Sequence, residues 1–241
     1  MCNFVSLRKT EEQIEDRFNA QMNIPLLYEP YYFRSGFDHS NLFIITQEQT
    51  DRITPATWGF VPDFASTWID SFHKKYDTLN ARSETIFVSN TYSQSISSKR
   101  CLIIADGFFE PFKLNDVSYP HFCQYLDQGL FAFAGVYNTH DDDLHSCSII
   151  TKKANDFFSK VHNNKLRMPM VLDQSFELEW LRRDLNKKGI EDLIEFGFTK
   201  EKFEAFPVTK DVNKVSLNRN VPSIIEPQTF PELDMYKQLF S

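Results

Sequence analysis

The chain lacks the sequence patterns that mark metal centres, disulfide frameworks and membrane spans. Its four cysteines stand at positions 2, 101, 123 and 147 without a Cys-x-x-Cys pair, and no His-Glu-x-x-His motif is present. No apolar run is long enough to cross a membrane, and the first residues carry no signal-peptide pattern. We therefore expect a cytoplasmic protein that has no metal site or cofactor and does not contact a membrane.

Low-complexity segments, internal repeats and linkers are also absent. The 7 Gly and 11 Pro are spread along 241 residues, which favours a single domain over residues 1–241. Positive charge is scarce, since 26 Lys and Arg stand against 33 Asp and Glu and give a net charge of −7. This balance argues against a protein that coats nucleic acid through its overall charge, although it leaves room for a local basic cleft.

Phenylalanine is abundant instead, with 24 in the chain, and most of these rings are expected in a core. Short apolar runs predict strands, and apolar side chains at four-residue spacing predict helices. Strands dominate the middle of the sequence and do not alternate with helices, which predicts an α+β fold with a mostly antiparallel, barrel-like sheet and peripheral helices. A turn at Asp127-Gln128-Gly129 predicts a β-hairpin. The expected strands are residues 4–7, 42–46, 57–61, 85–89, 101–105, 119–126, 130–137, 146–151 and 203–208, and the expected helices are residues 11–21, 154–161, 176–185 and 190–196.

Three helices carry recognisable end signals. Thr10 and Gln13 have the spacing of a capping box at the start of the first helix. Asp173 or Ser175 is a suitable N-cap for the helix at 176–185. Gly197 follows the last helix, where a left-handed C-terminal cap is expected.

The first two residues, Met1 and Cys2, suggest a reactive N-terminus. A small residue after Met1 allows the initiator to be removed, which would leave Cys2 with a thiol and an α-amine on adjacent carbons. An α-amine has a reference pKa of about 7.7–8.0, so roughly a tenth of it is neutral and nucleophilic at pH 7, far more than for lysine. Such a 1,2-aminothiol would react first with an aldehyde. A cysteine at position 2 is more often incidental, so this interpretation depends on the rest of the chain.

Three later residues could support chemistry at such a group. Glu110 ends an apolar run rich in aromatic residues, where a carboxyl group is suited to proton transfer, although it could equally be a strand-end glutamate facing solvent. His162 precedes a polar loop, and imidazole titrates near neutral pH. Asn80 could orient a reacting oxygen or cap a turn. The other histidines compete with His162 and cannot be ranked by position; they are His39, His73, His121, His140 and His145.

Several basic residues are candidates for phosphate contacts, although a solvated surface explains them equally well. His145 and Cys147 would share one face of a strand, but two ligands do not make a metal site. The basic candidates are Arg82, Lys165 and Arg167, with Lys152, Lys153 and Lys160 near them in the sequence.

A series of short motifs runs through almost the whole chain. They are Met1-Cys2, Trp58-Gly59-Phe60-Val61-Pro62, Asn80-Ala81-Arg82-Ser83-Glu84-Thr85, Arg100-Cys101-Leu102-Ile103-Ile104-Ala105-Asp106-Gly107-Phe108-Phe109-Glu110, Phe131-Ala132-Phe133-Ala134-Gly135, Ile149-Ile150-Thr151, His162 with Arg167-Met168-Pro169, Pro207-Val208-Thr209 and Ile225-Glu226-Pro227. Each motif is modest alone, but their order and joint presence resemble the SOS-response-associated peptidase (SRAP) family, whose members shield abasic sites in single-stranded DNA.

The resemblance implies that Cys2, freed of Met1, is the covalent residue and that Asn80, Glu110 and His162 complete the active site. The Cys2 amine would condense with the aldehyde of an opened abasic deoxyribose to a Schiff base, and the thiol would close a five-membered thiazolidine ring. Glu110 and His162 would move protons, while Asn80 would hold the terminus or the sugar oxygen. The implied partner is single-stranded DNA with abasic sites, bound by a monomer. The residues expected to contact DNA are Arg82, Arg167, Thr151, Phe64 and Lys165.

Three places depart from the family pattern. Asn3-Phe4 stands where many members have Gly-Arg, which removes one phosphate contact. Phe64 stands where a wedge tryptophan is common, and Pro111 replaces an aromatic residue after the glutamate, so base stacking is expected to be weaker.

Other functions remain open at the level of sequence. An N-terminal-nucleophile amidohydrolase would use the Cys2 thiol to attack an amide and would need an oxyanion hole. A cysteine peptidase, as the family name suggests, could act on its own leading residue without a separate protein substrate. A non-covalent DNA-binding module would bind without Cys2.

Overall fold

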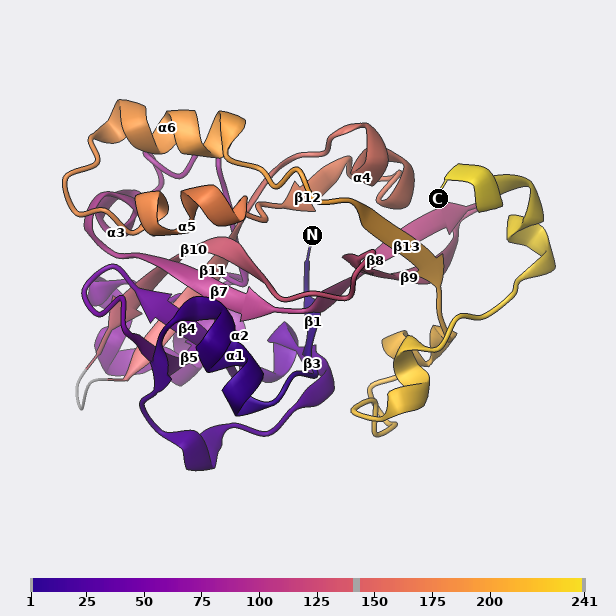
Figure 1. Cartoon of the computed structure of the whole chain (residues 1–241), viewed down its shortest axis with the longest axis horizontal. Coiled ribbons are helices and arrows are strands. Elements are labelled where there is room, and N and C mark those ends of the chain that lie inside the picture. Colours follow the sequence, from indigo (N-terminus) through magenta and orange to yellow (C-terminus); the bar gives the residue numbers. More distant parts are fainter. Residues whose placement is uncertain (1, 141–143, 240–241) are drawn as a thin grey trace.

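A computed structural model describes residues 2–140 and 144–239. The strands lie in the centre of the molecule, and the helices lie around them (Figure 1). The strands are β1 (Phe4–Leu7), β2 (Gln21–Met22), β3 (Tyr31–Ser35), β4 (Asn41–Thr46), β5 (Arg52–Trp58), β6 (Asn80–Arg82), β7 (Arg100–Ala105), β8 (Gly107–Leu114), β9 (Val117–Tyr125), β10 (Phe131–Thr139), β11 (His145–Lys153), β12 (Arg167–Pro169) and β13 (Phe203–Pro207). The α-helices are α1 (Glu11–Phe18), α2 (Ile69–Lys75), α3 (Ser93–Ser98), α4 (Asp156–Val161), α5 (Gln174–Trp180) and α6 (Lys187–Phe196), and short 3₁₀ helices include η3 (Asp63–Trp68) and η7 (Pro231–Leu239).

The larger sheet closes on itself through its strand pairings. Strands β11, β10, β7, β4 and β5 pair in sequence, and β5 pairs back to β11 in parallel. This last pairing covers three residues on each strand, so the strands form a ring of pairings rather than a regular barrel. Strands β12, β6 and β2 extend the ring. The α+β class with mostly antiparallel pairing is confirmed, with parallel pairs only where β11 meets β5 and β6, and where β2 meets β5, among the described strands.

The smaller sheet is antiparallel, in the order β13-β9-β8-β1-β3. A two-residue turn joins β8 to β9, where Asn115 and Asp116 both adopt positive φ values of 48° and 63°. That geometry matches the twist of paired strands and is favoured by short polar residues. Strand β1 lies between β3 and β8, so the first residues of the chain begin inside a sheet rather than at its edge.

Aromatic side chains join the two sheets. Phe108 of β8 contacts Phe131 and Phe133 of β10 edge to face, with ring centroids 6.1 and 5.7 Å apart. Phe158 of α4 and Phe203 of β13 pack onto the same ring. The expectation that most Phe residues form a core agrees with this cluster, whose large rings bury much apolar area.

Predicted strands at 4–7, 42–46, 101–105, 146–151 and 203–208 are confirmed within about three residues at each end. The capping box at the start of α1 is also confirmed, because the Thr10 hydroxyl accepts from the Gln13 N–H and the Gln13 side chain accepts from the Thr10 N–H. Asp173, rather than Ser175, is the N-cap of α5.

The predicted hairpin between 119–126 and 130–137 is wrong. Both segments are strands, but β9 pairs with β8 and β13, whereas β10 pairs with β7 and β11. The turn exists, since Gln128 has a positive φ of 57° and the Gly129 N–H donates to the Asp127 carboxylate. It carries the chain from one sheet to the other, which a local turn signal cannot distinguish from a hairpin.

Several element boundaries were also wrong. The first helix ends at Phe18 because Asn19 adopts a left-handed conformation, and residues 21–22 form a strand. The strand predicted at 57–61 is the end of β5, which starts at Arg52. Residues 83–88 form consecutive turns instead of a strand. The helices at 154–161, 176–185 and 190–196 are α4, α5 and α6 with shifted ends.

Gly197 caps α6 without a left-handed conformation, because its φ is −83°. Glycine is favoured here because the backbone of the preceding helical turn lies too close for a side chain. A Cβ at this position would lie 2.5 Å from the Leu193 carbonyl oxygen, which accepts the Gly197 N–H.

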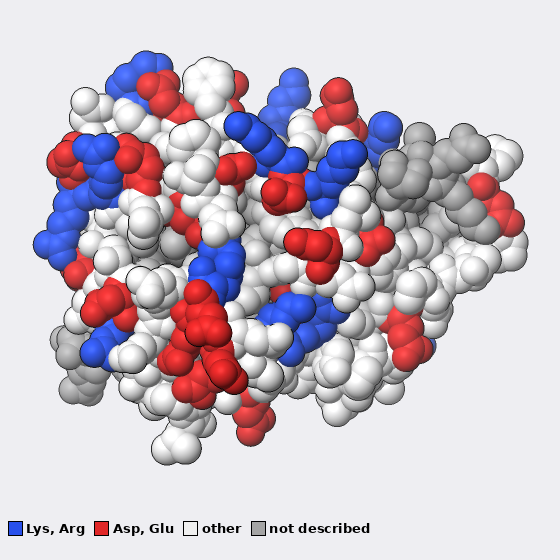
Figure 2. All heavy atoms as spheres, viewed as in Figure 1, with Lys and Arg blue, Asp and Glu red and all other residues white. Residues whose placement is uncertain are grey.

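Acidic and basic side chains are interspersed on the surface. Figure 2 shows blue and red groups side by side over the face that it presents, without a broad field of one sign. This distribution agrees with the net charge of −7 and limits attraction of DNA to local clusters of basic residues. No helix among the described residues is long and apolar enough to cross a membrane.

Candidate functional site

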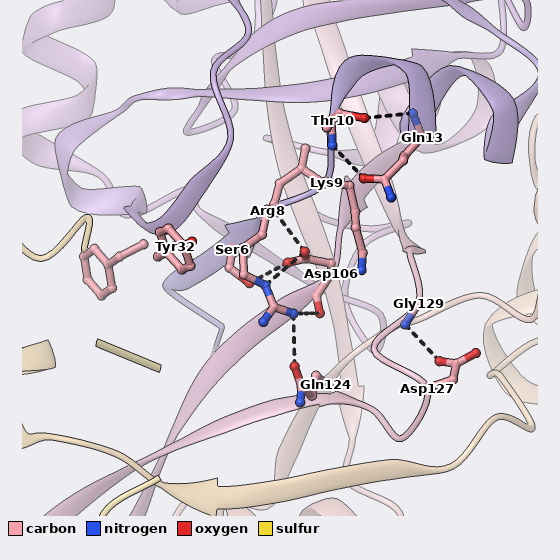
Figure 3. A network of polar contacts seen from close by, with 12 residues as sticks. Ser6, Arg8, Lys9, Thr10, Gln13, Tyr32, Asp106, Gln124, Asp127 and Gly129 are labelled. Carbon is pink, nitrogen blue, oxygen red and sulfur yellow. Dashed lines mark hydrogen bonds and ion pairs between the residues drawn. The ribbon is translucent and has the colours of Figure 1, made fainter. Parts of the chain in front are cut away.

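A buried polar network fixes β1, the strand that follows Cys2 in the chain (Figure 3). The Asp106 carboxylate, at the β7–β8 junction, accepts hydrogen bonds from the Ser6 hydroxyl at 2.7 Å and from the Arg8 N–H at 2.8 Å. The Arg8 guanidinium donates to the same carboxylate at 3.0 Å and reaches Gln124 of β9. Because Asp106 is fully buried, removal of the Arg8 side chain would leave an unpaired charge inside the fold. The network therefore holds β1 in one register against β8 and β9.

Cys2 lies just before β1 and is completely buried. The next residue is anchored as well, because the Asn3 carbonyl accepts from the Gly36 N–H at 2.9 Å. Burial raises the pKa of the Cys2 thiol well above its usual value, and the nearby Glu110 carboxylate raises it further. The thiol is therefore protonated at neutral pH. Met1, whose removal the sequence analysis requires, lies outside the described residues.

Asn80 reaches the N-terminal segment from the larger sheet. Strand β6 carries it, held in parallel against β11 with Asn80 opposite Ile149. Its amide nitrogen donates to the Asn3 side-chain oxygen at 3.0 Å. Its own amide oxygen is buried and makes no hydrogen bond to the described residues. An unpaired buried acceptor on a side chain that bonds to Asn3 is suited to receive a donor from a bound molecule.

Glu110 and His162 form a buried pair. The Glu110 carboxylate, on β8, lies 3.1 Å from His162 Nδ1, and both side chains are almost fully shielded from solvent. The α4 helix positions the histidine, whose N–H donates to the Phe158 carbonyl and whose carbonyl accepts from the Leu166 N–H. The charge of Glu110 also acts on the Cys2 thiol. The structure thus brings Cys2, Glu110 and His162 to one place, together with Asn80.

A pocket of about 380 Å³ opens beside this group. Glu110, His162 and Lys165 of the predicted set line it. Other lining residues carry no sequence motif that predicts a site. Lys113 follows Glu110 on the same strand, a proximity that could have marked it, whereas Phe37 and Asn213 come from distant segments and left no signal. The remaining lining residues are Asn3, Phe4, Phe109, Pro111, Ser118, Pro120, Asn164 and Val212.

Arg167 is bound within the protein. Its guanidinium makes two hydrogen bonds to the Glu84 carboxylate, at 2.8 and 3.0 Å, and donates to the backbone and hydroxyl oxygens of Thr151 at 2.7 and 3.1 Å. Partial burial works against the charge of Glu84, but the bonds from Arg167 outweigh it and lower the pKa of Glu84. Strand pairing also sets Arg82 beside Thr151. Arg82 is exposed, whereas a phosphate would have to compete with Glu84 for Arg167.

Phe64 lies in η3, outside the lining of this pocket, and is 61% exposed. Its ring packs edge to face on Phe72, 6.3 Å away, and Trp68 packs on the same ring at 5.4 Å. The exposed faces of both rings are available for stacking. The structure therefore leaves the predicted aromatic contact on the surface rather than at Cys2.

The remaining candidates are engaged elsewhere. His39 and His73 stack on each other at 3.9 Å and contact the backbone of Trp58 and Gly59. The Cys147 thiol contacts the Ala56 carbonyl, at 3.9 Å. Within residues 2–140 and 144–239, no three His, Cys, Asp or Glu side chains gather in a way that could hold a metal ion.

These features define a class of protein in which a buried cysteine at position 2 lies near a glutamate–histidine pair inside two joined sheets. The chain belongs to the family described as SOS response associated peptidase (SRAP), whose model matches residues 1–215.

Known proteins resemble the chain over nearly its full length. It is 30% identical to the abasic site processing protein YoqW of Bacillus subtilis over 233 residues, which cover 94% of this chain and 99% of that protein. It is also 30% identical to the abasic site processing protein YoaM of the same organism, over 90% of this chain and 95% of that protein. A crystal structure of a protein from Bacteroides thetaiotaomicron superposes with a TM-score of 0.83 at 27% identity, and covers 95% of this chain and all of that one.

Proposed function

We propose that this protein shields abasic sites in single-stranded DNA by a covalent thiazolidine crosslink to Cys2. The observation that carries the proposal is that Glu110, which is paired with His162, lies near enough to the buried Cys2 thiol to raise its pKa, while Asn80 bonds to the adjacent Asn3. Relatives that share the family and 30% of the sequence are named abasic site processing proteins. An abasic deoxyribose supplies the aldehyde with which an N-terminal aminothiol reacts.

The reaction needs two bond-forming steps. The Cys2 α-amine attacks the aldehyde carbon, and loss of one water gives an imine. The thiol sulfur then bonds to the imine carbon while its proton passes to the nitrogen, which closes the ring without any oxidant. The amine is the nucleophile of the first step because only nitrogen can form the imine on which the thiol then closes the ring. The thiol proton is then available when the ring closes.

The surrounding residues have roles that follow from their positions. Glu110 and His162, 3.1 Å apart, form a proton-transfer pair for ring opening of the sugar and for dehydration to the imine. The free oxygen of Asn80 accepts a hydrogen bond from the Cys2 amine or a sugar hydroxyl. At the pocket mouth, Lys165 contacts a phosphate, and Arg82, Arg167 and Thr151 contact the strand beyond it. Phe64 stacks on an exposed base.

Peptidase chemistry in this proposal is limited to the protein's own N-terminus. Removal of Met1 exposes the aminothiol, and Cys2 with the Glu110–His162 pair could catalyse that step itself. Intact-mass measurement of the wild type beside Glu110→Gln, both made with and without cellular methionine aminopeptidase, tests this. Retention of Met1 in both proteins without the aminopeptidase would exclude self-removal. We further propose that the protein acts as a monomer in the cytoplasm, on the DNA of the nucleoid.

The decisive experiment uses a single-stranded oligonucleotide with one abasic site. Wild-type protein with its mature N-terminus confirmed by mass should give a slow band on a denaturing gel, and Cys2→Ala should not. Cys147→Ala is the matched control, because Cys147 is also a buried thiol and only burial raises its pKa. Full crosslinking by Cys2→Ala, or none by the wild type, would reject the covalent function and favour a non-covalent DNA-binding module or an amidohydrolase.

A further inference from the structure

The pocket beside Cys2 lies where β1 begins. This strand starts at Phe4, between β3 and β8 in the smaller sheet. Both neighbours continue past that point, because β3 leads into the 3₁₀ helix η2 (Gly36–Asp38) and β8 extends well beyond its pairing with β1. Phe37 of η2 and Lys113 of β8 both line the pocket. They therefore flank the N-terminal end of β1 from its two sides.

The Phe37 ring is exposed on a backbone that is held in place. The N–H of the preceding Gly36 donates to the Asn3 carbonyl at 2.9 Å, and the Phe37 N–H donates to the Ser35 hydroxyl oxygen at 3.2 Å. The ring packs against that of Phe4 with a centroid distance of 6.0 Å and an interplanar angle of 67°, and 58% of the residue stays exposed. An exposed aromatic ring in the lining of a pocket is a stacking surface for a flat group.

The exposed charges in the lining of this pocket are both positive. Lys113 and Lys165 are exposed, whereas the one carboxylate in the lining, that of Glu110, is buried beside His162. Within residues 2–140 and 144–239, neither lysine amine forms an ion pair. Both amines are therefore available to an anion that enters the pocket.

A nucleotide combines the two features that this lining would bind. Its base is a flat π surface, and its phosphate carries negative charge, so one aromatic ring and two amines suit the two parts. The pocket volume of about 380 Å³ lies near the lower end of the range for small-ligand sites, which leaves room for one nucleotide rather than several.

We propose that this pocket holds the nucleotide next to the abasic site, with its base stacked on Phe37 and its phosphate bound by Lys113 and Lys165. The inference rests on the proposed function and adds to it a requirement for a neighbouring base. Stacking tolerates any of the four bases, so the requirement is for a base and not for a particular sequence. Because the pocket accepts one nucleotide, only one of the two neighbours of the abasic site, on its 5′ or on its 3′ side, is held in this way.

Binding is measured with single-stranded oligonucleotides whose central residue is tetrahydrofuran, an abasic analogue without an aldehyde, so that no crosslink forms. In two further oligonucleotides the 5′ or the 3′ neighbour is also tetrahydrofuran. The affinity of the wild type, from fluorescence anisotropy, should fall about tenfold when one of these neighbours loses its base and change little when the other does. Equal affinities for all three strands would overturn the proposal.

The variant Phe37→Leu tests whether this ring stacks on the base. It should bind the complete strand about tenfold more weakly than the wild type and be insensitive to loss of either neighbouring base. Its affinity for the strand that lacks the stacked base should equal that of the wild type, which also shows that the variant is folded. Phe196→Leu, at a residue of α6 that is 73% exposed, is the matched control and should keep the wild-type pattern. Continued sensitivity of Phe37→Leu to the same neighbour would overturn the assignment to this ring.

The variant Lys113→Gln tests the phosphate contact. It should weaken binding to all three strands and reduce the slope of log affinity against log salt by about 0.7 in magnitude, the value for one phosphate on a single strand. Lys202→Gln, at an exposed lysine outside the pocket lining, should leave the slope unchanged. The same slope for Lys113→Gln and the wild type would overturn the phosphate assignment.

Crosslinking to an authentic abasic site, measured separately, distinguishes this inference from the proposed function. Wild-type protein that crosslinks but shows no dependence on either neighbouring base would overturn the inference alone. Dependence on Phe37 and on one neighbouring base, without any crosslink, would uphold the nucleotide site and reject the covalent function.

Discussion

The side-chain amide of Asn163 forms both hydrogen bonds to the backbone of Lys113. Its oxygen accepts from the Lys113 N–H at 2.8 Å and its nitrogen donates to the Lys113 carbonyl at 2.7 Å. Asn163 thus takes the place of a strand residue beside β8. Because it directly follows His162, and Lys113 lies on the strand that carries Glu110, the contact ties the two halves of the Glu110–His162 pair together.

Asn163→Ala should therefore slow crosslinking while the fold persists. The two hydrogen bonds to Lys113 contribute about 1 kcal/mol each, so without them His162 is held less firmly beside Glu110. We therefore expect the crosslinking rate to fall about tenfold. Single-turnover crosslinking and thermal unfolding would be measured together. Asn90→Ala, at an exposed asparagine before α3, is the matched control and should match the wild type. An unchanged rate for Asn163→Ala would remove this residue from the positioning of His162.

Glu110 and His162 should act as one unit. Glu110→Gln and His162→Ala are each expected to lower the crosslinking rate about a hundredfold, the range typical of general acid–base groups. The double variant should be little slower than either single one, because each change already disables proton transfer through the pair. A multiplicative loss in the double variant, measured on the same abasic oligonucleotide, would mean that the two side chains work separately.

Glu84 should restrain the binding of DNA by Arg167. Glu84→Gln removes the charge that engages the Arg167 guanidinium, so the affinity for single-stranded DNA is expected to rise about threefold or more. The dependence of affinity on salt should steepen, because one more phosphate is neutralised. Fluorescence anisotropy at several salt concentrations measures both effects. Glu179→Gln, at a surface carboxylate paired with Arg182, is the control. Equal affinities for the two variants would show that Arg167 is structural.

His121 should make the fold sensitive to acid. It lies opposite Glu110 in the β8–β9 pairing, and burial lowers its pKa to about 4 although its contact with the Tyr119 carbonyl favours the charged form. Below about pH 6.5 the unfolded chain binds a proton at His121 that the folded protein does not bind. The contribution of His121 to the free energy of unfolding is therefore complete above that pH and decreases as the pH falls towards 4. The difference between the ordinary pKa of 6.5 and the folded-state pKa of about 4 corresponds to a loss of about 3 kcal/mol in the free energy of unfolding, at 1.36 kcal/mol per pH unit.

Urea unfolding at pH 7, 6 and 5 would measure this loss. His121→Phe keeps a ring against Phe112 and should flatten the decline over that range. The same decline in both proteins would assign the acid sensitivity to other groups.

Sequence patterns succeeded where local chemistry decides the outcome. The capping box of α1, the Asp173 cap of α5 and the apolar runs of β4 and β7 depend on residues within a few positions of one another, and all four are present. They failed where partners are distant. The turn at 127–129 has a local signal for a hairpin. Nevertheless β9 pairs with β8 and β13 in one sheet, whereas β10 pairs with β7 and β11 in the other.

The candidate site divides in the same way. Residue types and motif order alone point to Cys2, Asn80, Glu110 and His162 and to the family. Only the tertiary structure decided that Glu110 meets His162, that Asn80 reaches Asn3, and that Arg167 is held by Glu84. It also decided that the Asn163 side chain bonds to the backbone of Lys113. A sequence specifies which groups are available, whereas burial and strand pairing between remote segments fix their distances, and those distances determine the chemistry.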